Sequence, residues 1–300
     1  MRWLWIAVFG FGAVSAAPPS IRPQPPVCEP VPGSERTWNT RVFRIESEIQ
    51  VAPDRLQRLA QVADTTAQAV RDHPLPFYAP PENDRPVLRI YGTVESYAAA
   101  GAMAETAGCY LWKRREVALN AVHLFQKIPG SRLGPLTDED LVVHEIVHLC
   151  MHGSQGRMPQ WFSEGACEYF AAAHRGAGRF QFTDIEREIR LLLKKRLAPD
   201  GGATELLAIR EVAGLGSRDW STKMLRLQPE DRYRGYATGL LLFHYHLHGE
   251  RFDDLKIALK RQPPAPPESF EELPNEAPQL ERGLVEFWKG HGLGVRFTVP

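Results

Sequence analysis

The order of strand-like and helical segments along the 300-residue chain predicts an α+β fold. Segments with the alternating apolar pattern of strands gather in the first half, whereas from Thr137 onward the apolar residues recur mostly at helical spacing. Hydrophobic residues make up 43% of the chain, which is enough for a sizeable core. We therefore expect one domain over residues 37–300, with a sheet-rich lobe at 37–136 and a helical lobe at 137–300.

In the first lobe, a helix is expected between strands. The strand candidates are residues 40–49 (TRVFRIESEI), 85–93 (RPVLRIYGT) and two pieces of 108–125 (GCYLWKRREVALNAVHLF) around a charged turn. Residues 53–73 begin with a proline and have a helical apolar period. Near the end of the chain, the proline-rich residues 261–278 predict a linker, and residues 280–290 (LERGLVEFWKG) predict a helix that packs back on the body.

The first twenty residues, MRWLWIAVFGFGAVSAAPPS, have the pattern of an export signal. One positive charge precedes an apolar run, and small residues follow at the spacing that a signal peptidase recognises before Ala17. The run is shorter than the ~20 residues that span a bilayer. We expect a signal peptide at 1–16, a secreted or periplasmic protein without stable membrane insertion after cleavage, and a proline-rich, extended tether at 17–36.

Four cysteines, an even number, suit an oxidising compartment, and at least one disulfide bond is expected. The pairing of Cys28, Cys109, Cys150 and Cys167 is open, and buried free thiols are the alternative for the last two. None of the four has the Cys-x-x-Cys spacing of a zinc ribbon, so they are not predicted as metal ligands.

The charge of the chain is balanced, with 36 lysines and arginines against 36 aspartates and glutamates. A nucleic-acid partner normally requires an excess of positive charge. The composition therefore gives no reason to expect nucleic-acid binding, and function has to be sought in particular side chains.

The segment DEDLVVHEIVHLCMHG, residues 138–153, places two histidines and a glutamate in an aliphatic helix. Thr137 can cap this helix and Gly153 can end it. His144 and His148 are four residues apart, so both imidazoles share one face and can reach a single tetrahedral ion. Glu145 is rotated by about a third of a turn and can address a water molecule at that ion. A catalytic zinc site is predicted, and a polar cluster without metal is the alternative.

A third ligand is expected from the next helix, in MPQWFSEGACEYFAAAHRG. Pro159 stands where this helix should begin, and the loop before it is short, so the two helices should form a hairpin. At 1.5 Å per residue and about 8–10 Å between helices, Glu164 reaches the height of His148. Glu168 lies one turn further on the same face and can accept the remaining ring hydrogen of a ligand histidine, although an ordinary surface acid is the alternative.

Other histidines are weaker candidates. His152 and His174 are the substitutes if Glu164 is not a ligand. His244, His246 and His248 have no acid between them and are followed at once by a glycine, so they are interpreted as the end of a helix.

Together, the segments HEIVH and WFSEGACEYF resemble the gluzincin branch of the zinc metallopeptidases, particularly the secreted proteins grouped as peptidase-MA-like. In that group a Trp-x-x-Glu-Gly stretch supplies the third ligand. The resemblance implies a zincin-like fold, in which a small twisted sheet lies over an active-site helix with a helical second lobe. It also implies Zn²⁺ held by His144, His148 and Glu164, with Glu145 as general base.

The resemblance extends to weaker flanking segments. It implies that GCYLWKRREVALN contains the edge strand that faces the substrate. It also makes Tyr236, or Tyr233 close to it, the candidate for stabilising the oxyanion, with simple packing in the core as the alternative role.

The function predicted from these residues is a secreted zinc peptidase, in first place an endopeptidase that takes a peptide or protein substrate in extended form. Two alternatives stay open, an aminopeptidase and a zincin-shaped module that binds or assembles without catalysis. Glu145 favours catalysis, because a structural zinc site closes with a fourth ligand and has no need of a general base. The oligomeric state is open.

Overall fold

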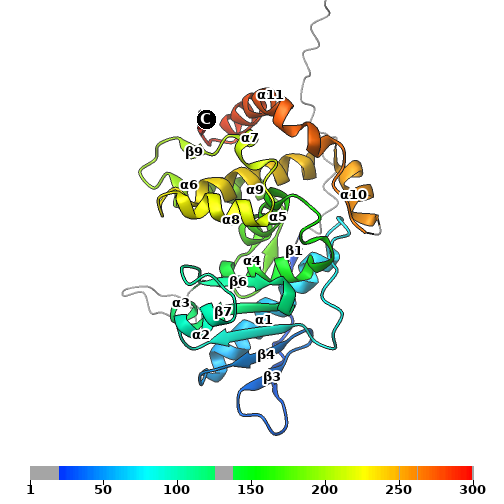
Figure 1. The fold of residues 1–300 in the computed structure, drawn as a ribbon, viewed down its shortest axis with the longest axis vertical. Coiled ribbons are helices and arrows are strands. Elements are labelled where there is room, and N and C mark those ends of the chain that lie inside the picture. The colour runs from blue at the N-terminus through cyan, green and yellow to red at the C-terminus, as the bar shows by residue number, and fades with distance from the viewer. Residues whose placement is uncertain (1–19, 126–137, 250, 262, 299–300) are drawn as a thin grey trace, which may run out of the picture.

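The computed structural model describes residues 20–125, 138–249, 251–261 and 263–298. The predicted signal peptide at 1–16 and the predicted cap Thr137 lie outside these residues. Within them the fold is α+β, as the order of the segments predicts. In Figure 1 the strands of the main sheet lie in the lower half and most helices in the upper half, with α4 between them.

The main sheet has six strands in the order β2-β3-β4-β5-β7-β6. Strands β4, β5 and β7 are parallel to one another, whereas β2, β3 and β6 are each antiparallel to their neighbours. The strands are β2 (Glu29–Pro30), β3 (Thr37–Asn39), β4 (Arg44–Ser47), β5 (Val87–Tyr91), β6 (Gly108–Leu111) and β7 (Glu116–Asn120). Among the described residues β6 pairs only with β7, so it is an edge strand.

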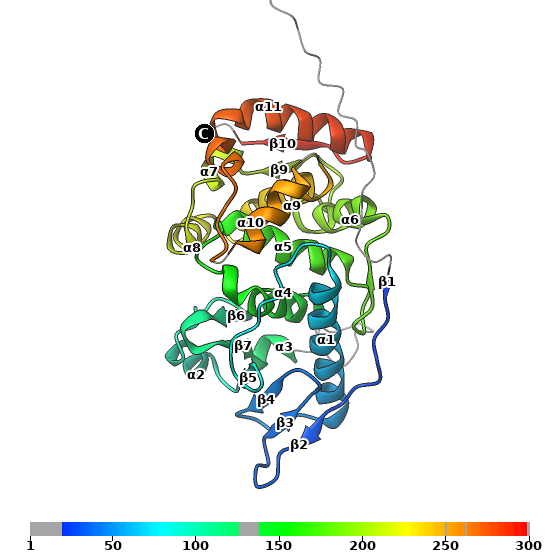
Figure 2. The same cartoon turned by 90° about the vertical axis from the view of Figure 1, so that its right-hand side faces the viewer.

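Helices cover the two faces of this sheet unequally. The parallel step from β4 to β5 is made by α1 (Pro53–Asp72), which packs beside α4 (Glu139–Cys150) on one face, as Figure 2 shows. Alternate residues such as Val117 and Leu119 point into the main core on that face. Ala118 points the other way, into a small cluster with Tyr97 of α2 (Val94–Ala99).

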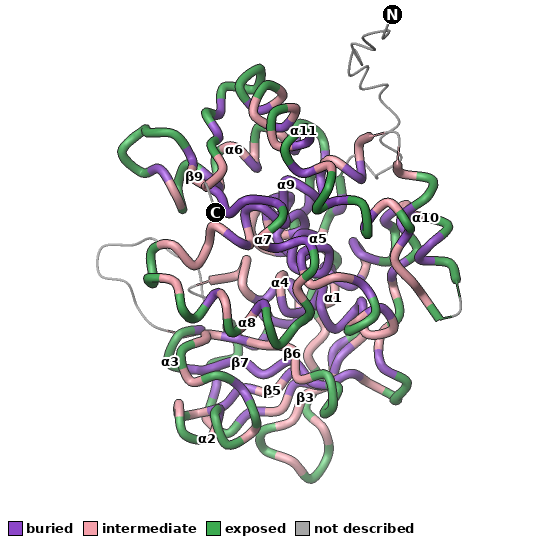
Figure 3. The backbone as a smooth tube through the Cα atoms, turned by 45° about the horizontal axis from the view of Figure 1, so that its top comes forward, coloured by how far each residue is buried: buried purple, intermediate pink, exposed green. Residues whose placement is uncertain are grey.

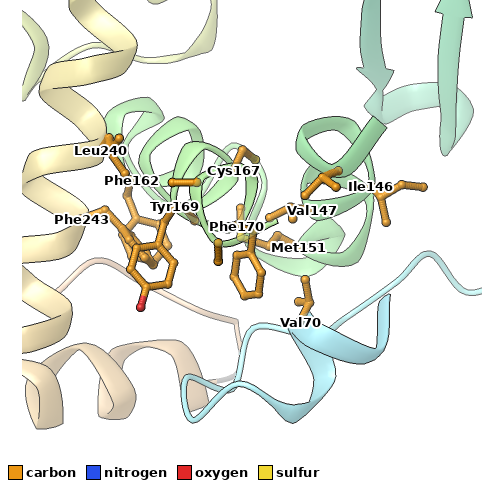
Figure 4. Packing of buried hydrophobic residues seen from close by; sticks show 14 of the residues in the cluster. Val70, Ile146, Val147, Met151, Phe162, Cys167, Tyr169, Phe170, Leu240 and Phe243 are labelled. Carbon is orange, nitrogen blue, oxygen red and sulfur yellow. The ribbon is translucent and has the colours of Figure 1, made fainter. Parts of the chain in front are cut away.

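The helical lobe is built around α5 (Gln160–Ala173) and α9 (Tyr233–His248), most of whose residues are buried (Figure 3). Gly165 and Gly239 lie where the two helices touch: a Cβ on Gly165 would stand 2.7 Å from the carbonyl carbon of Gly239. Figure 4 shows the core between α1, α4, α5 and α9, with Phe170 and Val147 facing each other. The helices that carry the candidate site are therefore fixed by packing.

The remaining elements surround this core. They are η1 (Trp112–Arg114), α3 (Ala121–Leu124), η2 (His152–Ser154), β8 (Phe180–Gln181), α6 (Ile185–Leu197), β9 (Thr204–Leu206), α7 (Ile209–Val212), α8 (Ser217–Arg226), α10 (Phe252–Lys260), α11 (Ser269–Gly290) and β10 (Val295–Phe297). β9 and β10 form a parallel pair, and α11 packs on α7 and β10.

Residues 20–36, expected as an extended tether, are extended but also pair with the body. β1 (Ser20–Ile21) is antiparallel to β8, and β2 joins the main sheet through β3. Ile21 is buried in the main core. From residue 20 onward, this segment is therefore part of the folded domain.

The expected linker at 261–278 is shorter than predicted, because α11 already begins at Ser269 and contains Pro274 and Pro278. The helix tolerates these prolines because Phe270, Leu273 and other residues of one face are buried. The end of the helix packs on the body as expected, with Trp288 fully buried.

All four cysteines are free, which differs from the expected disulfide. Cys28 and Cys109 lie in different surroundings. Burial raises the pKa of these thiols, to about 11 for Cys28 and about 12 for Cys109. The charge of Asp64 also raises the pKa of Cys28, and the charge of Glu145 also raises that of Cys109.

Among the described residues, no helix combines the length and the apolar character that a membrane crossing requires.

Candidate metal centre

α4 fixes the two histidines and the glutamate of the HEIVH segment. Its cap is Asp138, whose side chain accepts a hydrogen bond of 3.0 Å from the backbone amide of Leu141. The aliphatic residues of the helix are buried and hold it in place. His144 and His148 lie on one face with their ring centroids 4.9 Å apart. The two imidazoles are thus close enough for both to reach one ion.

α5 brings Glu164 to these histidines. Its Oε2 atom lies 3.2 Å from Nε2 of His144 and 3.4 Å from Nε2 of His148. Oε2 is buried and no side chain in hydrogen-bonding geometry satisfies it, whereas Oε1 accepts a bond of 2.7 Å from the Gln160 amide. A buried oxygen without a well-aligned donor, facing two imidazole nitrogens, is what a three-ligand cation site requires.

The far side of the His144 ring contacts a carboxylate. Glu168 Oε1 lies 3.1 Å from Nδ1 of His144, and Glu168 Oε2 accepts a hydrogen bond from the Tyr233 hydroxyl. A carboxylate at Nδ1 fixes the tautomer that leaves the Nε2 lone pair free. Glu168 therefore links α9 to the histidine through the phenol.

The His148 ring is held by Gln155, from the loop after α4. The side-chain nitrogen of Gln155 lies 3.0 Å from Nδ1 of His148 and 3.4 Å from the backbone oxygen of the same residue. In this orientation Gln155 donates a hydrogen bond to the ring, and only the opposite amide orientation would accept the Nδ1 hydrogen and leave Nε2 free. Neither Gln155 nor Gln160 was predicted from the sequence, because a glutamine near a helix end has no pattern that distinguishes it.

Cys167 is a second candidate for the third position. Its sulfur lies within 4.8 Å of possible ligand atoms of both histidines. Burial raises the pKa of this thiol well above its usual range, and the carboxylates of Glu164, Glu145 and Glu168 raise it further. A metal needs the thiolate, which this environment opposes. This electrostatic environment favours Glu164 over Cys167 as the third ligand.

Glu145 is buried next to the edge strand. Its carboxylate accepts a hydrogen bond from the backbone amide of Tyr110 in β6. A Cβ on Gly108 would stand 3.1 Å from Cγ of Glu145, so the glycine allows the strand to approach this side chain. Burial raises the pKa of Glu145, although the two histidines oppose the shift. A carboxylate with a raised pKa is suited to accept a proton.

The charges of the site are strongly coupled. Burial acts to lower the pKa of His144. Hydrogen bonds to Glu164 and Glu168 outweigh burial and raise this pKa well above its usual range. Burial raises the pKa of Glu164, but His148 and His144 outweigh it and hold the pKa well below its usual range. The imidazoles and the Glu164 carboxylate thus stabilise opposite charges on one another, and a cation that binds here would compete with a proton.

Tyr236 and Tyr233 of α9 stack at 6.2 Å beside the histidines. The Tyr236 ring centroid is 6.4 Å from that of His144, and burial raises the Tyr236 pKa, so its hydroxyl stays protonated. The hydroxyl of Tyr233 is already donated to Glu168. The hydroxyl of Tyr236 is thus not bound to Glu168, in contrast to that of Tyr233.

The substitute histidines do not join this site. His152 Nδ1 lies 2.6 Å from the Tyr110 hydroxyl, and its ring stacks on Trp112. His174 Nδ1 lies 2.8 Å from Asp140 Oδ1 at the start of α4. Each has another partner, so Glu164 has no competitor among these histidines.

The end of α9 falls at His248, as the sequence predicts. The structure adds a contact there that the sequence does not indicate, because Glu186 of α6 joins His244 and His248 in a second group with possible ligand atoms within 4.8 Å of one another. The described residues thus contain two groups that could hold a metal ion.

A scan against protein-family models gives no match for this chain, and a search of curated proteins gives none either.

Proposed function

We propose that this protein is a zinc-dependent endopeptidase with a zincin-like fold that acts outside the cytoplasm. The observation on which the proposal depends is the pair of contacts, 3.2 and 3.4 Å, between Glu164 Oε2 and the Nε2 atoms of His144 and His148. Two imidazoles and one carboxylate are the ligand set of many catalytic zinc sites. The export-like start of the chain supports the location.

The architecture is compatible with this proposal. A mixed sheet ends in an antiparallel edge strand, α4 packs against that strand, and a helical lobe supplies Glu164 from α5. The same arrangement is what the resemblance to gluzincins implies. The lack of a match to known families leaves the proposal to depend on the site itself.

A zinc ion held by His144, His148 and Glu164 would supply Lewis acidity to a peptide carbonyl and to water. The protein's own groups do the rest of the chemistry. Glu145 takes a proton from the attacking water and passes it to the leaving amine, which its raised pKa favours. Tyr236 donates its hydroxyl hydrogen to the oxyanion. Glu168 holds the His144 imidazole in the required tautomer, and the Gln155 amide contacts the His148 ring and fixes its orientation.

The substrate direction follows from β6. An extended peptide can add to the outer side of this strand, where main-chain hydrogen bonds bind any sequence. Since the Tyr110 amide already reaches Glu145, a peptide on this edge would lie beside the base. The stack of Trp112 on His152 borders the same strand, and Trp112 is 52% exposed, which favours apolar side chains of the substrate.

The test is the variant Glu145→Gln, which keeps the size and removes the base. Purified wild type should hold about one catalytic zinc ion and cleave members of a broad peptide library. The variant should keep its zinc and lose hydrolysis by about 100-fold or more, the scale of general-base catalysis. Glu95→Gln is the matched control. Glu95 is an exposed glutamate in α2, outside the metal centre, and this variant should cleave like wild type.

Two outcomes would replace the proposal. Cleavage restricted to peptides with a free amino terminus, with none on amino-blocked peptides, would establish an aminopeptidase. Wild type with full zinc content that cleaves nothing, or equal cleavage by wild type and Glu145→Gln, would leave only the binding or assembly role.

A further inference from the structure

A second cluster of metal-binding side chains lies at the opposite end of α9 from Tyr233 and Tyr236. It contains Glu186 from the first turn of α6, and His244 and His248 from the last turns of α9. His244 Nε2 lies 3.1 Å from Glu186 Oε1. At 1.5 Å per residue, the eight residues from Tyr236 to His244 correspond to about 12 Å along the helix, so the two clusters are separate.

The geometry repeats that of the first centre. His244 and His248 are four residues apart on one helix, and their rings stack with centroids 4.4 Å apart. A carboxylate from a different helix completes the set, with possible ligand atoms within 4.8 Å of one another. Two imidazoles at this spacing with one carboxylate can coordinate a single ion.

A simple ion pair between Glu186 and His244 accounts for only part of the cluster. That ion pair joins Glu186 Oε1 to Nε2 of His244. His248 adds a second imidazole, which stacks on the His244 ring and brings a possible ligand atom within 4.8 Å of those of Glu186 and His244. One ion pair does not require this second ring.

The surroundings can hold these ligands in place. His244 is fully buried, and its ring packs against Trp288 and Phe287 of α11. The hydroxyl of Tyr169 in α5 lies 3.4 Å from Nε2 of His248 and can orient that ring. Glu186 and His248 are partly exposed, so an ion can enter from solvent.

We propose that Glu186, His244 and His248 bind one divalent transition-metal ion of the zinc class. Imidazole nitrogens favour zinc, cobalt, nickel or copper over magnesium and calcium. The ion would join α6 to α9 and stabilise the helical lobe. This inference does not depend on the peptidase proposal, because it concerns other side chains and its test measures binding.

The test isolates the second cluster by removing the first. In His144→Ala/His148→Ala protein, titration with Zn²⁺ by calorimetry should give a stoichiometry near one ion per chain, and Co²⁺ should give visible absorption bands of a low-coordinate site. Zn²⁺ should also raise the melting temperature. Adding Glu186→Gln or His248→Gln to this protein should abolish all three effects, because a three-ligand site has no spare ligand.

Controls separate binding from folding. His123→Ala removes an exposed histidine outside both clusters and should change nothing. In the intact background, Glu186→Gln and His248→Gln should each lower the zinc content by about one ion, which decides the question even if the double alanine protein is unfolded by circular dichroism. Zinc content and zinc-dependent melting that are unaffected by Glu186→Gln and by His248→Gln would overturn the proposal.

Discussion

One carboxylate oxygen, Oε2 of Glu164, connects the two helices of the candidate metal centre. It is buried, faces two imidazole nitrogens and has no well-aligned donor. Burial of this carboxylate costs desolvation free energy, which the interactions with His148 and His144 offset. A bound cation would provide the same compensation.

Replacing Glu164 by glutamine should therefore abolish zinc retention at the centre of His144 and His148 and lower the zinc content by about one ion, because the oxygen becomes a weaker, neutral ligand. Glu168→Gln keeps all three ligands and should cost about 10- to 100-fold in affinity, as outer partners of ligand histidines do. Zinc content after dialysis and a competition titration measure both. Equal effects of the two substitutions would contradict the assignment of Glu164 as ligand and Glu168 as support.

Gly108 has no side chain, and this leaves room for the side chain of Glu145. A methyl group there would stand 3.1 Å from Glu145 Cγ, so Gly108→Ala should displace the base by a few tenths of an ångström. We expect kcat on a cleaved peptide to fall by about 10-fold or more with zinc content unchanged. Gly202→Ala, which adds a methyl group with no atom within 4 Å, should have wild-type kcat. A wild-type rate for Gly108→Ala would show that this contact does not matter.

His144, Glu145 and His148 could be chosen from the sequence because helical spacing places them on adjacent faces, and Glu164 because a short loop predicts a hairpin that brings the next helix to the same height. Gln155 and Gln160 could not, since their contacts depend on a loop path and a rotamer. The same reason hid Glu186, which is 58 residues from His244 in sequence and meets it only through the packing of α6 on α9.

At the scale of elements, the contact between α5 and α9 depends on glycine. A Cβ on Gly165 would stand 2.7 Å from the Gly239 carbonyl carbon, closer still to its oxygen, and 2.8 Å from Cβ of Phe243. The two backbones therefore approach more closely than side chains would permit.

Gly165→Ala should destabilise the protein by about 2 kcal/mol or more, the upper range of overpacking, even though alanine favours a helix over glycine by about 1 kcal/mol. Chemical denaturation measures this free energy of unfolding. Gly290→Ala, at the end of α11 with nothing within 4 Å, is the control and should be neutral or slightly stabilising. Similar stabilities for both variants would mean that the helices can separate without cost.

Most elements follow from local patterns, and the exceptions have tertiary causes. Helical period predicts α1 at nearly the observed bounds, and strand alternation predicts segments that contain β4, β5, β6 and β7 but are longer than the strands themselves. The prolines of 261–278 indicate a linker, yet α11 starts within it because burial of Phe270 and Leu273 outweighs two missing backbone donors. Likewise, residues 20–36 have the composition of a tether, and only their pairing with distant strands orders them.

At the scale of the whole molecule, buried neutral histidines make stability sensitive to acid. Burial lowers the pKa of His73 from 6.5 to about 3, and the neighbouring His248 contributes. Below pH 6.5 the His73 ring is protonated in the unfolded chain, whereas in the folded protein it stays neutral until about pH 3. The stabilisation by neutral His73 is thus complete above pH 6.5 and is lost as the pH falls toward 3.

Wild type should therefore lose about 2 kcal/mol of unfolding free energy between pH 7 and pH 5 through His73 alone. His73→Leu removes the titrating group and should reduce the pH dependence by that amount, although its stability at pH 7 is lower because the Leu75 amide loses its acceptor. Urea denaturation at both pH values checks this. A pH dependence identical to that of wild type would refute the buried, neutral state of His73.

The glycine contact between α5 and α9 also constrains motion. Because the two backbones touch, α5 and α9 behave as one rigid body that carries Glu164, Glu168, Tyr233 and Tyr236 together. This body also packs on α4 in the same core, and α4 carries the two histidines. A zinc ion held by all three ligands would therefore link α4 to the rigid body and oppose their separation, so that local unfolding at this contact would depend on metal occupancy.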